Sequence, residues 1–487
     1  MPPTPSPTPA HALVAALAGA LGAELIETHI SWVLLAGGFA YKVKKPVRLP
    51  FVDYGTLAAR RHFCEEELRL NRRLAPSLYL GLTRITGPEA APELDGAGPV
   101  LEYAVRMRRF APGALFGERM DAGTLAREDV DRLAALLAGF HGASAPAVLD
   151  DRIGTAQLRR RAALAALEGA CPAASAARQA QLRTWLEAQA AALAPLWTAR
   201  RDGGHVRECH GDLHLDNIVC LDDAVAAFDC IEFDAALRYI DVIDDLAFAV
   251  MDFSARGRGD FAFRLLCDWL DRTGDHAALP ALRFSVVYRA LVRAQVAQLR
   301  GPGNEPAARR YLECALSWTR PAQPRLFITQ GLPGSGKTFR SQRLLEREGA
   351  IRLRSDVERK RLFGLGMLED SRSRGLDLYG AESTARTYGH LLAAARLALR
   401  CGYPVIIDAA FLRRDERDRA HALARELGLP FFIVRCEAPL QVLRERLLAR
   451  KGDASEADTA VLEKLHALAL PLERDELPLV YSEADGG

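Results

Sequence analysis

The sequence lacks the marks of a secreted or membrane-bound protein. Its nine cysteines are an odd number, widely scattered, and no two of them have the Cys-x-x-Cys spacing that zinc and redox motifs use. No apolar run approaches the ~20 residues that a membrane-spanning helix needs. The proline-rich start has neither the positive charge nor the apolar segment of a signal peptide. We therefore expect free thiols, a cytoplasmic location and no membrane partner.

Lysine is scarce, and the net charge is small. Only 7 of the 64 basic residues are Lys, and four of these seven lie in segments that we interpret below as ATP-binding. The alternative is a compositional bias toward Arg that left a few Lys by chance, so the argument rests on the motifs around these lysines and not on their number. A net charge of +2 gives no large basic surface, which argues against nucleic acid as a partner.

The chain of 487 residues is too long for one ordinary hydrophobic core. Strands and one helix are expected up to about residue 105, and mostly helices from there to residue 319. The stretch Thr319–Pro324 then breaks the pattern, and the remaining residues alternate strand and helix, as in a parallel sheet wrapped by helices. The sequence therefore predicts a disordered leader over residues 1–10, an α+β domain over 11–320, a linker over 321–324 and an α/β domain over 325–487.

A first phosphoryl-transfer motif is His210-Gly-Asp-x-x-x-x-Asn217. In kinase chemistry an Asp at the position of Asp212 accepts the proton of the substrate hydroxyl, and the Asn binds a metal ion. Asp229 ends a short apolar run and is placed to bind Mg²⁺ together with Asn217. The alternative is a metal site that overlaps this motif, formed by Cys209, His210, His214 and Cys220.

Upstream residues supply the phosphate-binding partners that this chemistry needs. Lys42 and Lys44 point to the same face of a predicted strand, so either lysine can reach the ATP phosphates. Glu66 or Glu67 on the following helix can pair with that lysine, or both can be ordinary solvated charges. We favour Lys42 with Glu67.

With these motifs, the first ~320 residues resemble the aminoglycoside and choline phosphotransferase branch of the protein-kinase-like fold. Asp229 is followed by Cys-Ile-Glu where protein kinases have Phe-Gly, and this suits the same branch. The resemblance implies a small N-terminal lobe up to about residue 105, a hinge near Met107–Pro112 that binds adenine, and a helical C-terminal lobe.

Several acidic residues further along the chain have two interpretations. Asp244 and Asp245 resemble the segment that supports the catalytic loop in this branch, or they are carboxylates that favour a helix N-terminus. Glu232, Asp234 and Asp241 favour a cationic acceptor, or they are solvated or support neighbouring groups. We prefer the second interpretation for these three.

A second motif, of a different kind, is Gly-x-x-x-x-Gly-Lys-Thr, which follows an apolar strand and opens a helix. Such a loop surrounds phosphates with backbone N–H groups, its Lys reaches the β- and γ-phosphates, and its Thr binds Mg²⁺. The residues that we assign to this ATP site are Gly331, Gly334, Ser335, Gly336, Lys337 and Thr338.

The surroundings of this loop favour a kinase. The strand that ends at Asp408 lacks the following glutamate that hydrolytic ATPases use to activate water, and we assign Asp408 to the metal ion. Asp356 follows another strand and is the candidate base for a substrate hydroxyl, with Arg359 nearby. Arg446 and Arg450 lie on a candidate lid where they can stabilise the transferred phosphoryl group, or they belong to a solvated helix face.

Residues 325–487 resemble the small P-loop kinases grouped with polynucleotide kinase, gluconate kinase and zeta toxins, through the loop, Ser355–Arg359, Val405–Phe411 and Arg446–Ala457. The whole chain resembles a bacterial arrangement in which an aminoglycoside-phosphotransferase-like domain is fused to such an ATP-binding domain. Asp408 lacks the Thr-Asn that follows it in relatives of polynucleotide kinase, which argues against a nucleic-acid acceptor.

We therefore expect an ATP-dependent phosphotransferase with two separate Mg-ATP sites that act on alcohol groups of small molecules. One alternative is a single active kinase domain that a nucleotide-binding second domain regulates. The other is a nucleic-acid end-processing kinase, which requires a basic groove.

Overall fold

The structure, a computed structural model, describes residues 9–482 apart from 50–51, 149, 151–152, 171–174, 223, 302, 321–322, 372–373, 375–377, 379 and 451–453. Residues 1–8 of the predicted leader and 321–322 of the predicted linker therefore lie outside the described residues, while Pro9 already begins a helix. No helix in the described part is long and apolar enough to cross a membrane. The chain forms two compact units, Met1–Arg159 with Ala194–Ala249, and Arg160–Leu193 with Val250–Gly487.

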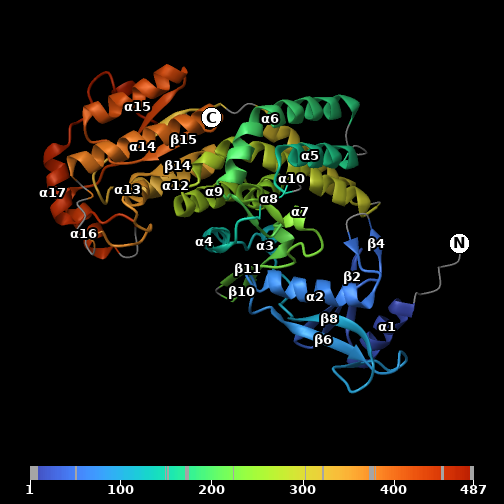
Figure 1. Cartoon of the computed structure of the whole chain (residues 1–487). Coiled ribbons are helices and arrows are strands. Elements are labelled where there is room, and N and C mark those ends of the chain that lie inside the picture. The colour runs from blue at the N-terminus through green and yellow to red at the C-terminus, as the bar shows by residue number, and fades with distance from the viewer. Residues whose placement is uncertain are drawn as a thin grey trace. The chain divides into compact units, whose positions relative to one another are not determined.

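An antiparallel sheet of six strands forms the first part of the first unit, in the order β1-β2-β3-β8-β6-β7. In β3, Tyr41 and Val43 pack with helix α1 in one apolar cluster, so Lys42 and Lys44 face the opposite side. Glu67 of helix α2 contacts both lysines, so α2 lies on that opposite side. Figure 1 shows α2 alongside the strands of this sheet. The elements are α1 (Pro9–Leu21), β1 (Glu24–Glu27), β2 (Ser31–Ala36), β3 (Phe39–Lys44), β4 (Arg48–Leu49), β5 (Val52–Asp53), α2 (Leu57–Asn71), β6 (Tyr79–Thr86), β7 (Glu93–Leu94) and β8 (Val100–Arg108).

Short hairpins and helices follow this sheet in the chain. The loop that contains Asp212 runs from β9 to β10; β9 pairs with β12, and β10 pairs with β11. Helices α5, α6 and α8 begin in one unit and end in the other. The elements are α3 (Phe116–Asp121), α4 (Arg127–Ala143), α5 (Ala156–Ala170), α6 (Ala176–Asp202), β9 (Val206–Glu208), β10 (Ile218–Leu221), β11 (Ala224–Ala227), α7 (Ala235–Arg238), β12 (Tyr239–Asp241) and α8 (Val242–Ala255).

The second unit contains the predicted parallel sheet, with four strands in the order β14-β15-β13-β16. These strands are buried nearly throughout, as continuous apolar runs in parallel sheets are. The fold class predicted for both parts of the chain is confirmed. The elements are α9 (Gly259–Thr273), α10 (Leu279–Leu299), α11 (Glu305–Thr319), β13 (Leu326–Gln330), α12 (Lys337–Glu348), β14 (Ile351–Arg354), α13 (Ser355–Leu362), α14 (Ala381–Arg400), β15 (Val405–Asp408), α15 (Arg414–Leu427), β16 (Phe431–Arg435), α16 (Leu440–Ala449) and α17 (Thr459–Leu468).

Helix α9 packs against the parallel-sheet region of the same unit. Arg264 of α9 donates to Glu346 of α12 over 2.7 Å, and Asp271 lies 3.3 Å from the guanidinium of Arg352 on β14. Cys267 also belongs to the apolar cluster beneath α12. These contacts place α9, which precedes the predicted boundary, in one compact unit with the parallel sheet. The boundary at residues 321–324 stays a prediction.

A buried carboxylate strengthens this packing. Glu358 of α13 is fully buried and lies 3.1 Å from the ring of His276, in the short 3₁₀ helix His276–Ala278, and 2.9 Å from the ring of His390 on α14. Arg361 also pairs with Glu358. Burial opposes ionisation of Glu358, but these donors outweigh it and hold its pKa well below the ordinary value.

We expect His276→Ala to lower the free energy of unfolding by about 2–4 kcal/mol, because a desolvated charge loses one of its partners. The pKa of Glu358 is lowered by folding, so this loss should be complete near neutral pH and should shrink as the pH falls below the ordinary carboxyl range. Urea denaturation at a series of pH values measures both effects. Arg272→Ala, which removes an exposed ion pair with Asp268, is the matched control and should cost under about 0.5 kcal/mol. Equal losses in the two variants would contradict the role of His276.

Candidate active sites

A buried aspartate holds the first candidate loop in place. Asp245 of α8 accepts hydrogen bonds from the backbone N–H groups of His210, over 3.1 Å, and Gly211, over 2.9 Å, and lies 3.1 Å from the ring of His141. Gly211 has φ +88°, and a Cβ atom there would lie 2.8 Å from the backbone oxygen of Leu237. Burial opposes ionisation of Asp245, but the His141 hydrogen bond and the N–H donors outweigh it and lower its pKa to about 2.

The loop brings the predicted base and a predicted metal ligand together. The side-chain nitrogen of Asn217 donates to the backbone oxygen of Asp212 over 2.9 Å and lies 3.3 Å from its carboxylate. The Asp212 carboxylate also lies 3.5 Å from the His214 ring and remains partly exposed. Because the nitrogen of Asn217 is engaged, its amide oxygen is the atom left to bind a metal ion.

Asp229 follows β11 in a left-handed backbone conformation, with φ +64°. Its backbone N–H donates to the hydroxyl of Tyr79 over 3.1 Å, and the next N–H, of Cys230, donates to the side chain of Asn71 over 2.8 Å. These two bonds fix a conformation that residues other than glycine seldom adopt. The Asp229 carboxylate forms an ion pair with Lys42.

Both candidate lysines share one glutamate. Glu67 is fully buried, and its two oxygens accept from Lys42 over 2.9 Å and from Lys44 over 2.7 Å. Burial opposes ionisation, but the two ammonium groups outweigh it and lower the pKa of Glu67 to about 2. Lys42 also reaches Asp229, whereas Lys44 pairs with the buried Glu232. The structure thus brings Lys42, Glu67 and Asp229 together and gives Lys44 a different neighbour.

The remaining acidic candidates have structural partners. Glu66 pairs with Arg69 on the helix surface, over 2.9 Å. Asp234 caps α7, because its side chain accepts the backbone N–H of Ala236, the second residue of the helix, over 2.8 Å. Asp241 is buried against Arg200, at 2.7 Å. These contacts, with that of Glu232, favour support of neighbouring groups over recognition of a cationic acceptor.

The alternative metal site is not formed by the four residues that overlap the motif. Among the described residues, the group of His, Cys and carboxylate side chains close enough to share an ion is His141, Cys209 and Asp245, whose ligand atoms lie within 4.8 Å of one another. His141 and Asp245 are hydrogen-bonded to each other, and Cys209 directly precedes His210, whose backbone N–H donates to Asp245.

The second candidate loop joins β13 to α12. A Cβ atom at Gly331 would lie 2.2 Å from the backbone oxygen of Cys436, so only glycine fits there. Lys337 is folded back over the loop, and its ammonium donates to the backbone oxygens of Gly331, over 3.0 Å, and Leu332, over 2.9 Å. Burial lowers the pKa of Lys337. Gly334, Ser335, Gly336 and Thr338 complete the loop.

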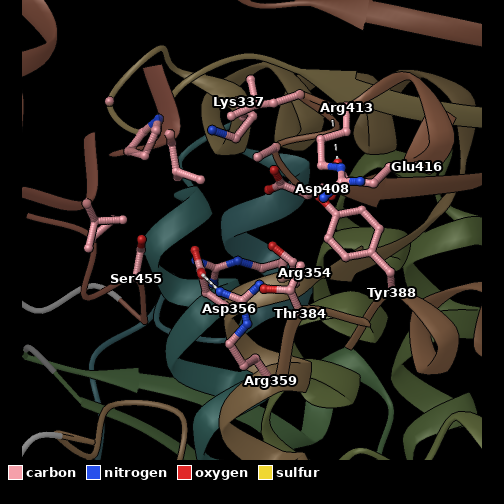
Figure 2. A pocket seen from close by; sticks show the side chains of 18 of the residues that line it. Lys337, Arg354, Asp356, Arg359, Thr384, Tyr388, Asp408, Arg413, Glu416 and Ser455 are labelled. Atoms are coloured by element: carbon pink, nitrogen blue, oxygen red, sulfur yellow. Dashed lines mark hydrogen bonds and ion pairs between the residues drawn. The ribbon is translucent and has the colours of Figure 1, made fainter. Parts of the chain in front are cut away.

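Two carboxylates face the cavity beside this loop. Asp408, at the end of β15, accepts a hydrogen bond from Ser341 of α12 over 2.9 Å and lines the cavity with Thr338. Asp356, in the first turn of α13, is partly exposed, and Arg359 lies 3.8 Å from it (Figure 2). The cavity measures about 640 Å³ and contains the predicted Lys337 as well.

The lid arginines also line this cavity. Arg446 of α16 donates to the backbone oxygen of Gly334 over 3.0 Å, and Arg450 lies 3.4 Å from the backbone oxygen of Ser455. Arg446 therefore contacts the phosphate loop from an exposed position, whereas Arg450 is half-buried and contacts Ser455. Their role in phosphoryl transfer stays a prediction, and so does the solvated-face alternative.

Several lining residues were not predicted from the sequence. Arg354 at the end of β14, Thr384 and Tyr388 of α14, and Arg413 before α15 surround Asp356 and Asp408 in Figure 2. The four-residue spacing of Thr384 and Tyr388 places both on one helix face, which is a weak signal.

Comparisons with known families support two kinase-type regions. The model of the phosphotransferase enzyme family APH matches residues 58–284, and the AAA domain model AAA_33 matches residues 326–472. The uncharacterized protein Rv2004c of Mycobacterium tuberculosis is 32% identical over 454 residues, which cover 91% of this chain and 89% of the relative. The uncharacterized protein Mb2027c of Mycobacterium bovis matches with the same identity and coverage.

Solved structures similar to each region also include kinases. A sugar kinase from Janibacter sp. HTCC2649 is 22% identical, over 31% of this chain and 81% of that protein, with a TM-score of 0.25. The amicoumacin kinase hAmiN is 15% identical, over 62% of this chain and 93% of that protein, with a TM-score of 0.39.

We expect Asp245→Asn to lower the free energy of unfolding by about 2–3 kcal/mol at pH 7, because the loop loses a charged acceptor. Folding lowers the pKa of Asp245 from 3.8 to about 2, so its contribution is present above about pH 4 and is lost as the pH falls toward 2. The difference between wild type and variant should therefore narrow over that range in urea titrations. Asp53→Asn, at an exposed site, is the control. A variant as stable as wild type at pH 7 would refute the anchoring role.

Proposed function

This chain belongs to the family of two-domain proteins that includes Rv2004c of Mycobacterium tuberculosis, and from that premise we propose that it transfers phosphoryl groups from ATP to alcohol groups of small molecules at two separate sites. The observation that carries the proposal is the convergence of Lys42, Asp212, Asn217 and Asp229 in one compact unit. Small molecules are the proposed acceptors, and the small net charge supports this over nucleic acid.

In the first site, one residue accepts the proton of the acceptor, and the others bind the metal ion and the phosphates. Asp212 accepts the proton of the acceptor hydroxyl as its oxygen attacks the γ-phosphorus. Asn217 and Asp229 offer an amide oxygen and a carboxylate, the donors that Mg²⁺ prefers, and the ion supplies charge neutralisation for the transferred phosphate. Lys42 moves from Asp229 to the ATP phosphates when the nucleotide enters, while Glu67 keeps it oriented.

In the second site the loop binds the nucleotide and the adjacent strands supply the acceptor side. The ammonium of Lys337 and the backbone N–H groups of residues 331–338, apart from Pro333, hold the phosphates, and Thr338 and Asp408 offer oxygens to Mg²⁺. Asp356 accepts the proton of the second acceptor. Arg446 and Arg450 stabilise the charge of the transferred group.

One observation also favours a regulatory role of the second domain. Glu358, which contacts His276, lies two positions after Asp356 on α13. His276 lies within the region that the APH model matches. A movement of His276 that displaced Glu358 would therefore also displace Asp356, the candidate base of the second site. Coupling between the sites is therefore the second candidate function.

We expect Asp212→Ala and Lys337→Ala to abolish different products. With γ-labelled ATP and a panel of alcohols, sugars, aminoglycosides and oligonucleotides, Asp212→Ala should reduce transfer at the first site about 10²–10⁴-fold, as loss of a general base does. Lys337→Ala should remove the remaining products only. The exposed-site variant Asp53→Asn serves as the control for both.

Two results would overturn parts of this proposal. If Asp212→Ala left every transfer intact, the first-site assignment would be wrong. If Lys337→Ala removed no product but changed the rate of transfer at the first site, the second domain would be a regulator.

A further inference from the structure

Helix α9 contacts the strand that leads into the second site. Cys267 and Asp271 lie four positions apart, so both are on one face of α9. The sulfur of Cys267 accepts from the backbone N–H of Arg352 on β14 over 3.4 Å, and the Asp271 carboxylate lies 3.3 Å from the guanidinium of the same arginine. This face of α9 therefore lies against β14, whose last residue, Arg354, lines the cavity of the second site.

Asp271 also lies close to that last residue. Its carboxylate is 3.8 Å from the guanidinium of Arg354, and its side chain is only 1% exposed. Arg352 and Arg354 are two positions apart on one strand, so their side chains share a face and their charges repel each other. One buried carboxylate thus supplies the negative charge for two guanidinium groups, and through Arg354 it acts on the wall of the cavity.

Arg354 has a second carboxylate near it. Asp356, the candidate base, follows two positions later in the first turn of α13, and Figure 2 shows it near Arg354. A guanidinium engages the oxygens of a carboxylate through paired N–H donors, and a carboxylate bound in this way is a poor proton acceptor. Arg359 already lies 3.8 Å from Asp356, and a second guanidinium would engage that carboxylate further. The position of Arg354 therefore affects whether Asp356 can act as a base.

We propose that Asp271 is a positioning residue of the second site, which holds Arg354 against α9 and so leaves the oxygens of Asp356 available to the acceptor hydroxyl. Without the Asp271 carboxylate, Arg354 turns toward Asp356 and pairs with it. Asp271 lies within residues 58–284, which the APH model matches, and outside residues 326–472, which the AAA_33 model matches. The second site is thus completed by a side chain of the other matched region. This role rests on the proposed kinase function of the second site.

The test uses the full chain with Asp212→Ala, so that only the second site can transfer label from γ-labelled ATP. Gluconate, glucose, glycerol and glucosamine serve as acceptors, and the kinetic constants are measured with the one that takes most label. We expect Asp271→Asn to lower kcat about tenfold or more, as partial loss of a general base does, and to leave the KM for ATP unchanged. Arg354→Gln should lower kcat less, because it leaves the base available. An unchanged kcat in a folded Asp271→Asn protein would overturn the proposal.

The two changes combined separate positioning from general damage. Asp271→Asn together with Arg354→Gln should recover much of the kcat that Asp271→Asn alone loses, because the guanidinium that engages Asp356 is gone. Losses that multiply in the combined variant would overturn the positioning role. Asp268→Asn, one turn earlier on α9 and paired with Arg272, is the matched control and should change neither constant.

Asp271 is buried, so each variant is first checked by thermal unfolding. If Asp271→Asn is unstable, the same comparison is made with Arg352→Gln in every protein, which removes the guanidinium that would lose its buried partner. Label in no acceptor, with nucleotide still bound, would instead contradict the kinase function of the second site. A crystal structure of Asp271→Asn then decides the positioning role: Arg354 paired with Asp356 would support it, and Arg354 still against α9 would overturn it.

Discussion

A carboxylate can stay ionised inside a protein only when cations or hydrogen-bond donors surround it, and this constraint determines how both candidate sites are assembled. Glu67, Asp245 and Glu358 are all fully buried, and folding lowers the pKa of each one. Their donors come from distant parts of the chain. Each carboxylate therefore fixes the relative position of segments that the sequence separates.

Removing one cation from such a buried carboxylate lowers the free energy of unfolding by more than the bond to that cation contributes. If Lys44 were replaced by an apolar residue, Glu67 would keep one ammonium, and Glu232 would lose its cation and keep the hydroxyl of Tyr54, over 2.5 Å. The uncompensated charge would cost more than the bond to Lys44 contributes. The second lysine thus helps to keep Glu67 charged and oriented toward Lys42, although it does not reach Asp229 in the structure.

Local patterns predicted the parts of the sites that are continuous in sequence. The loop from His210 to Asn217 and the glycine-rich loop before Lys337 have fixed spacings, and the apolar runs that end at Gln330 and Asp408 form the expected parallel strands. The fold class followed from the same patterns. The assignment of catalytic roles to these residues is still a prediction.

The contacts that the sequence did not predict join residues far apart in the chain. Lys44 and Glu232 are 188 positions apart, and His276 and Glu358 are 82 positions apart. No periodicity relates such pairs, because only the packed fold brings them together. The sequence also gave no sign of which charged side chains are buried. Asp241, for example, forms a buried ion pair with Arg200 that no local pattern indicates.

The packing of α9 bears on whether the two sites work independently. The region that the APH model matches extends to residue 284 and therefore includes α9 and His276, both of which contact the parallel-sheet region. Helix α13, which carries Asp356, contacts both of these elements, through Glu358 to His276 and through Arg361 to the backbone oxygen of Asp271 on α9. The buried ion pairs that stabilise α13 therefore also join it to residues that the APH model matches, so part of that matched region packs with the AAA_33 region in one compact unit.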